Sequence, residues 1–114
     1  MADNTFLSNL VVYTGTDFEQ TFVFEDDHTN SALNLTNYTG AANIRKYEGS
    51  EIAGTFLVTF TNRSLGKVRV SLGSTQTSVL KEGKYFYDLL LNSGSKVTRA
   101  IEGQVVVRKS VTQI

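Results

Sequence analysis

The chain has 114 residues, no cysteine and no proline, and its eleven basic and eleven acidic residues give a formal net charge of zero. This length suits one domain, the lack of cysteine excludes disulfides and thiolate metal sites, and zero net charge argues against general nucleic-acid binding. The first ten residues lack the segments of a signal peptide, and no apolar run has the length of a membrane span. We therefore expect a soluble protein made in a cytoplasm, with no nucleic acid and no membrane among its partners.

Charge is unevenly distributed along the sequence. Residues 1–57 hold eight acids and two bases, whereas residues 58–114 hold three acids and nine bases. Two interpretations stay open. A β-sandwich interleaves its two halves and would mix these charges, whereas separate acidic and basic surfaces would suit head-to-tail stacking of copies.

The elements expected in chain order are almost all strands. Residues 1–8 predict a polar arm that orders against a partner. Period-2 alternation of apolar and polar residues then predicts strands at 10–13, 18–25, 41–47, 55–61, 67–72, 85–91 and 97–109. In the strand at 85–91, Tyr85 and Tyr87 point inward, while Phe86 and Asp88 point outward.

Two local features complete this pattern. Ser74 is a suitable cap for a short helical turn near 74–80, and Gly103 in the last strand indicates a bulge or a close backbone approach. The sequence therefore predicts an all-β fold, an antiparallel β-sandwich of seven or eight strands. We expect a single domain at 9–109, preceded by an N-terminal arm at 1–8 and followed by a C-terminal tail at 110–114.

The residues that carry chemistry are few. His28 lies in a loop beside Glu25, Asp26 and Asp27, a composition that suits a divalent cation, but the spacing matches no metal-binding loop and favours a solvated turn. No phosphate-binding loop or nucleophile motif is present. Asp88 and Glu102 fit ordinary cross-strand pairing better than an acid/base dyad. The sequence therefore predicts no catalytic residue, no metal site and no cofactor.

The tyrosines divide into two groups. Tyr85 and Tyr87 fit core packing on a central strand. Tyr38 and Tyr47 lie near turns and are expected to be exposed as a pair that serves an interface. Outside the domain, Phe6 and Leu7 in the arm and Val111 and Ile114 in the tail are further candidate contacts, because extended peptide can add to the edge of a partner's sheet.

A known corner motif precedes the strand at 85–91. Gly83, two residues before Tyr85, resembles the tyrosine corner of immunoglobulin-like domains, in which the phenol ties down the preceding loop. The resemblance implies an immunoglobulin-like sandwich. The sequence departs from antibody-type domains, since it has no cysteine pair and no tryptophan, and Tyr87 occupies the position of the usual second cysteine.

A longer resemblance lies in the order of segments across residues 18–109. The segments are LTNYT at 35–39, AANIRK at 41–46, GKVRVSL at 66–72, TQT at 75–77, GKYFYDL at 83–89 and RAIEGQVVV at 99–107. In this order they resemble the immunoglobulin-like structural modules of tailed bacteriophage virions, such as the N-terminal domain of baseplate upper proteins.

The phage resemblance implies a function without catalysis. It implies a virion structural protein of the tail, baseplate or fibre-attachment region that contacts other virion proteins and acts as a homo-oligomer or in many copies. Its location would be the virion. Two alternatives stay open: a capsid decoration protein, and a carbohydrate- or receptor-binding module that uses Tyr38 and Tyr47.

Overall fold

The computed structural model of the chain describes residues 5–26 and 31–112. These residues form eight strands and two short helices, so the predicted all-β fold is confirmed. In chain order the elements are β1 (Phe6–Leu7), β2 (Leu10–Tyr13), β3 (Phe18–Val23), β4 (Thr39–Arg45), β5 (Ile52–Asn62), η1 (Arg63–Leu65), β6 (Lys67–Leu72), α1 (Ser74–Ser78), β7 (Gly83–Asn92) and β8 (Val97–Arg108).

The strands form where apolar and polar residues alternate. In β6, Val68 and Val70 are fully buried, while Lys67 at the start of the strand is exposed. In β7, Tyr85 and Tyr87 are buried and Phe86 is exposed. Because successive strand residues point to opposite sides of a sheet, this alternation gives each strand one buried side.

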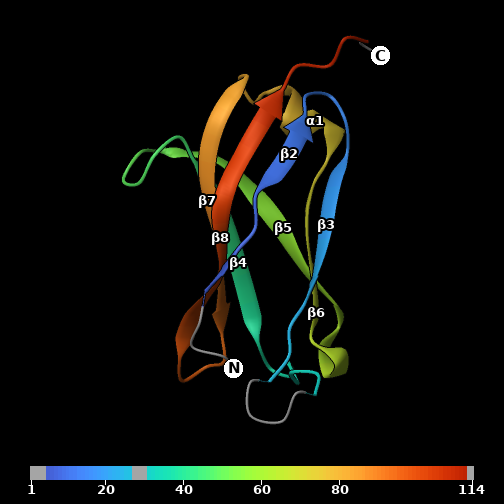
Figure 1. The fold of residues 1–114 in the computed structure, drawn as a ribbon, viewed down its shortest axis with the longest axis vertical. Coiled ribbons are helices and arrows are strands. Elements are labelled where there is room, and N and C mark those ends of the chain that lie inside the picture. Colours follow the sequence, from blue (N-terminus) through green and yellow to red (C-terminus); the bar gives the residue numbers. More distant parts are fainter. Residues whose placement is uncertain (1–4, 27–30, 113–114) are drawn as a thin grey trace.

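The strands join into a curled sheet with the order β1-β8-β7-β4-β5-β6-β3, and β2 also pairs with β8. β5 is shared, because its first residues pair with β4 and residues 57–62 pair with β6. Figure 1 shows the result: β4, β7 and β8 lie on one side of the molecule, β3 and β6 lie on the other, and β5 crosses between them.

The core fills the space between these two sides. The rings of Phe18 in β3, Phe56 in β5 and Tyr87 in β7 form a chain across it, with centroid distances of 5.9 and 5.7 Å. Ile44 and Leu89 are fully buried nearby, and burial of each such side chain contributes roughly 1.5–3 kcal/mol. The core thus draws on both sides of the curled sheet.

The expectation that the sheet is antiparallel is wrong for β1 and β2. Both run parallel to β8, and the pairs Phe6–Ile101 and Leu10–Val105 share the same offset of 95 residues. The free edge of β8 has unpaired main-chain donors and acceptors, which this segment satisfies. Phe6 and Leu7, placed by sequence in an arm outside the sheet, are therefore strand residues.

Ser8 and Asn9 interrupt the N-terminal strand at Gly103. A Cβ atom on Gly103 would lie 2.0 Å from the Ser8 carbonyl oxygen, so the close backbone approach predicted at this glycine is confirmed. The Tyr87 hydroxyl donates to the same oxygen at 2.7 Å, and the Gln104 N–H donates to Asn9 Oδ1 at 3.0 Å. These bonds satisfy polar groups that the interruption leaves without a strand partner.

The predicted helical turn is confirmed as α1, but its start differs from the expectation. Gly73 rather than Ser74 is the capping residue, and the Ser74 N–H donates to the Asp17 carboxylate at 2.8 Å. Thr77 is fully buried and its hydroxyl donates to the Thr16 carbonyl at 2.8 Å. The Asp17 carboxylate from outside α1 and the Gln76 side chain within it, which accepts from the Gly73 N–H at 2.8 Å, together fix the start of α1.

Candidate contact face

The side of β1, β2, β8, β7 and β4 that points away from the core is the candidate functional surface, here called the outer face. It consists of the outward side chains of these strands: Leu7, Asn9, Val11, Tyr13, Asn43, Arg45, Lys84, Phe86, Asp88, Arg99, Glu102, Gln104 and Val106.

The register of the strands arranges much of this face in three rows. The middle row has Phe86 between Arg45 and Gln104. One neighbouring row contains Lys84, Val106 and Val11. The other contains Asn43, Asp88, Glu102 and Leu7. Phe86 therefore lies at the centre of the outer face.

Large apolar side chains are exposed on this face. Among the described residues, Leu7 is 73% exposed and Phe86 is 48% exposed, and Val11 and Tyr13 are exposed to a similar extent as Phe86. Other large apolar side chains, such as Val23, Leu57 and Val79, are exposed elsewhere. The outer face is a candidate contact surface because its exposed apolar side chains lie on neighbouring strands.

The charges on the face are organised around Arg99. Asp88 and Glu102 lie directly opposite each other on β7 and β8, a placement of like charges that is unfavourable. Arg99 lies between them, with nitrogen–oxygen distances of 3.4 Å to Asp88 and 3.0 Å to Glu102. Since these side chains are roughly half exposed, each pair contributes less than about 1 kcal/mol.

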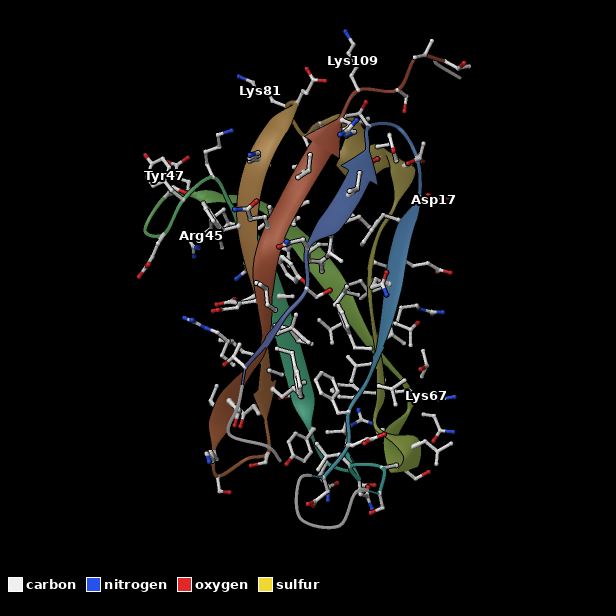
Figure 2. The ribbon with its side chains drawn as sticks, viewed as in Figure 1. Asp17, Arg45, Tyr47, Lys67, Lys81 and Lys109 are labelled. Carbon is white, nitrogen blue, oxygen red and sulfur yellow. The ribbon has the colours of Figure 1, made fainter. Side chains whose placement is uncertain are left out.

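A groove of about 730 Å³ runs over the middle of the outer face. Its walls are Leu7 and Asn9 from the N-terminal segment on one side and Glu48 and Gly49 from the β4–β5 hairpin on the other. Arg45 lies where this hairpin leaves the sheet and Tyr47 lies on the hairpin (Figure 2). The Arg45 guanidinium donates to the Ser50 carbonyl, which holds the hairpin against the end of β4.

The residues predicted as a structural corner lie at the start of β7. Tyr85 is buried and its hydroxyl donates to the Lys81 carbonyl at 2.7 Å, so the phenol ties down the loop before the strand. Gly83 has φ of +147°, a conformation that a side chain would strain. The Lys46 ammonium lies 4.8 Å from the centre of the Tyr85 ring.

The predicted interface residues do not form one site. Leu7 lies on the outer face, and Phe6 is exposed but belongs to the opposite side of the same strand. Tyr47 is 62% exposed on the hairpin and Val111 is exposed in the tail, while Ile114 lies outside the described residues.

Tyr38 differs from the expectation of an exposed tyrosine pair. It is half-buried and packs against the core, so it does not join Tyr47 at the surface. The backbone of its turn is fixed by the Arg63 guanidinium, which donates to the Tyr38 carbonyl at 2.7 Å and to the Leu35 carbonyl at 3.0 Å. The two bonds hold the turn at 35–38 against η1.

The remaining chemical candidates are the residues around His28 and the buried tyrosine of β7. The predicted solvated turn at His28 and Asp27 lies outside the described residues. Within 5–26 and 31–112, no group of histidine, aspartate and glutamate side chains is placed to hold a metal ion. Burial raises the pKa of Tyr87 from 10 to about 12, so its phenol remains a hydrogen-bond donor to higher pH than an exposed tyrosine would.

The described part of the chain contains no helix with the length and apolarity that crossing a membrane would need.

Comparisons with known proteins give structural likenesses at low identity. No family model and no curated protein matches the sequence. InlP of Listeria monocytogenes is 19% identical, with 89% of this chain and 26% of its own chain covered and a TM-score of 0.43. A family 123 glycoside hydrolase from Clostridium perfringens is 10% identical, with 97% and 24% covered and a TM-score of 0.45.

A third solved structure, of VGSC β subunits with multimeric cell-adhesive interactions, is 10% identical, with 93% of each chain covered and a TM-score of 0.45. This chain spans about a quarter of the length of the first two structures. Identities and TM-scores of this size assign no function to the chain.

Proposed function

We propose that this chain is a non-enzymatic structural protein of a tailed bacteriophage virion, at the tail, baseplate or fibre-attachment region, and that it acts through protein–protein contacts. The observation that carries the proposal is the outer face, on which Leu7, Val11, Tyr13 and Phe86 are exposed among charged residues of both signs. An apolar centre with charged and polar surroundings is the usual composition of a protein interface. The resemblance of the ordered segments at 18–109 to phage modules gives the virion context.

We infer further that the curled sheet is an immunoglobulin-like sandwich whose central strands are antiparallel. Two observations support this reading. The order of strands sets β4, β7 and β8 opposite β3 and β6, and the Tyr85 hydroxyl binds the loop before its own strand, as a tyrosine corner does. The parallel strands β1 and β2 are an addition at the edge of β8.

The geometry favours contact over catalysis. Asp88 and Glu102 are the adjacent carboxylates on the outer face, and Arg99 pairs with both of them. Ordinary pairing of charges across neighbouring strands accounts for this arrangement.

Immunogold electron microscopy of purified particles tests the virion proposal. The expected result is label at the tail or baseplate of wild-type particles and none on particles from a phage that lacks this gene. Label over the capsid surface would favour a decoration protein instead. Particles that carry no label, from a preparation whose lysate contains the protein, would contradict both locations.

The groove favours one second candidate, a carbohydrate-binding module. Its lining includes the exposed ring of Phe86 and polar side chains such as Asn43 and Gln104, a composition that suits a sugar stacked on an aromatic ring. A glycan array with the wild-type protein and Phe86→Ala separates the candidates. Binding that is lost in the variant would favour the module, and an array without signal would leave the contact function as the better account.

A further inference from the structure

The outer face has an internal symmetry about the row that contains Phe86. Along β7, Lys84 precedes Phe86 and Asp88 follows it, so opposite charges lie at equal distances from the aromatic ring. Along the N-terminal segment, Val11 and Leu7 lie at equal distances from Asn9. Lys84 and Val11 share one row, and Asp88 and Leu7 share the other.

This pattern suits a twofold axis. When two copies of a face pack together, the axis lies in the plane of contact, and each residue meets the residue at the mirrored position of the partner copy. An axis along the Phe86 row would place Lys84 against Asp88 of the other copy, twice. It would also place Val11 against Leu7 of the other copy, and the two Phe86 rings against each other.

We propose that the outer face binds a second copy of this chain in a face-to-face dimer with its twofold axis along the row of Arg45, Phe86 and Gln104. The inference rests on the proposed contact function and names the partner of that same face. Packing of the exposed Phe86, Val11 and Leu7 side chains contributes the affinity. The two Lys84–Asp88 pairs fix the orientation, because opposite charges across an interface determine its register.

Charge balance favours a copy over a partner of a single charge sign. The outer face has the cations Arg45, Lys84 and Arg99 together with the anions Asp88 and Glu102, and Glu48 adds an anion on the wall of the groove. A strongly acidic or basic partner would meet like charges over half of such a face. In a copy of the same face, Lys84 and Asp88 meet opposite charges at two points, while Glu102 meets Val106 and the two Arg45 side chains lie along the axis.

Sedimentation equilibrium of the purified chain gives the first test. Over a concentration series from about 10 μM to 1 mM, the wild type is expected to approach twice its monomer mass of 12.6 kDa. Phe86→Glu is expected to remain at the monomer mass. The matched control is Leu57→Glu, because Leu57 is 65% exposed on β5 and pairs with β6 rather than with a strand of the outer face.

Charge reversal gives the decisive test. Lys84→Glu and Asp88→Lys should each weaken self-association by at least about tenfold, because each places like charges together at two points. When the two variants are mixed, both contacts become opposite pairs, so a heterodimer should form with an affinity near that of the wild type. The double variant, with both reversals in one chain, should dimerise again.

Circular dichroism and thermal melting of each variant distinguish loss of contact from loss of fold. A wild type that stays monomeric throughout the series would overturn the inference. Dissociation by Leu57→Glu, or a mixture of the reversed variants that does not associate, would overturn it as well. The outcome is separate from the virion proposal: a monomer found in particles contradicts the dimer alone, and a dimer absent from particles contradicts the virion role alone.

Discussion

The hydroxyl of Tyr87 donates to the carbonyl oxygen of Ser8 at 2.7 Å and joins the central strand β7 to a segment 79 residues earlier in the chain. The contact is reached past Gly103, which pairs with Tyr87 and has no side chain between the two groups. The break between β1 and β2 is therefore held by one phenol and accommodated by one glycine of other strands.

Replacing Gly103 with alanine should detach the segment at 5–9. The new Cβ would meet the Ser8 backbone at 2.0 Å, and backbone cannot move aside as a flexible side chain can. We expect a loss of about 1–3 kcal/mol in the free energy of unfolding, the usual cost of overpacking, measured by urea denaturation. Hydrogen exchange should also show faster exchange at the Ser8 N–H, which donates to the Glu102 carbonyl.

Gly54→Ala is the matched control for this change. Gly54 is also a strand glycine, but a Cβ there would lie 3.6 Å from Ile44 and Leu80, an ordinary contact distance. The unfolding free energy of the Gly54→Ala variant should stay within about 0.5 kcal/mol of the wild-type value. Equal losses in both variants would show that the Ser8 contact is not the cause.

Tyr87→Phe should cost about 1 kcal/mol at neutral pH, because the Ser8 carbonyl loses its side-chain donor. Burial raises the pKa of Tyr87 to about 12 in the folded chain, while the unfolded chain releases this proton near 10. The contribution of Tyr87 is therefore complete below pH 10 and is lost as the pH rises through 12, by at most about 1.4 kcal/mol per pH unit.

Urea denaturation of both proteins across pH 8 to 12 checks this prediction. Because every other group titrates in both proteins, the difference between them isolates Tyr87. The wild type should lose its advantage over Tyr87→Phe between pH 10 and 12. A difference that stays constant over this range would mean that Tyr87 titrates alike in both states.

Tyr85→Phe should lower the free energy of unfolding by about 1 kcal/mol, because the Lys81 carbonyl loses its bond to the phenol. Tyr47→Phe makes the same chemical change on an exposed side chain and should be neutral. Chemical denaturation of the two variants measures the difference. If both were neutral, the corner at Tyr85 would not stabilise the fold.

Thr77→Val should also be destabilising although it keeps the shape of the side chain. The buried Thr77 hydroxyl donates to the Thr16 carbonyl at 2.8 Å and lies 3.2 Å from the Ser74 carbonyl. Removing the donor leaves a buried acceptor without this partner, at a cost of about 1–3 kcal/mol. Thr75→Val, on the exposed side of α1, serves as the control, and equal melting temperatures for the two variants would contradict the prediction.

Much of the fold could be predicted because alternation is a local signal. Residues 68–72 and 85–91 alternate cleanly, and the structure buries the expected side chains of both strands. β1 could not be predicted in the same way, since Phe6 and Leu7 are too few to show a period and their partners lie 95 residues away. The parallel direction of the N-terminal strand depends on that distant edge.

The two interpretations of the uneven charge can now be compared at one point. Glu19 belongs to the acidic half of the sequence and Arg69 to the basic half, and their side chains lie 3.9 Å apart on β3 and β6. The fold thus brings these charges together, as an interleaved arrangement requires. Since both side chains are substantially exposed, the pair adds little to stability.

The sequence alone predicts only part of the outer face. Alternation alone places Phe86 and Asp88 on the outward side of their strand. The rows across the face depend on the register between strands, and no turn joins the N-terminal segment to its partner β8, 95 residues later, to set that register. Tyr38 was misplaced for a related reason, because the guanidinium that holds its turn comes from Arg63, 25 residues later.

The direction of the first strand has a mechanical consequence. From Phe6 to Tyr13 the chain runs alongside residues 101–108 in the same direction. Tension that draws the beginning of the domain away from its end would therefore slide these two strands past each other. All their main-chain bonds would carry the load together, whereas an antiparallel pair pulled from its open end separates one bond at a time.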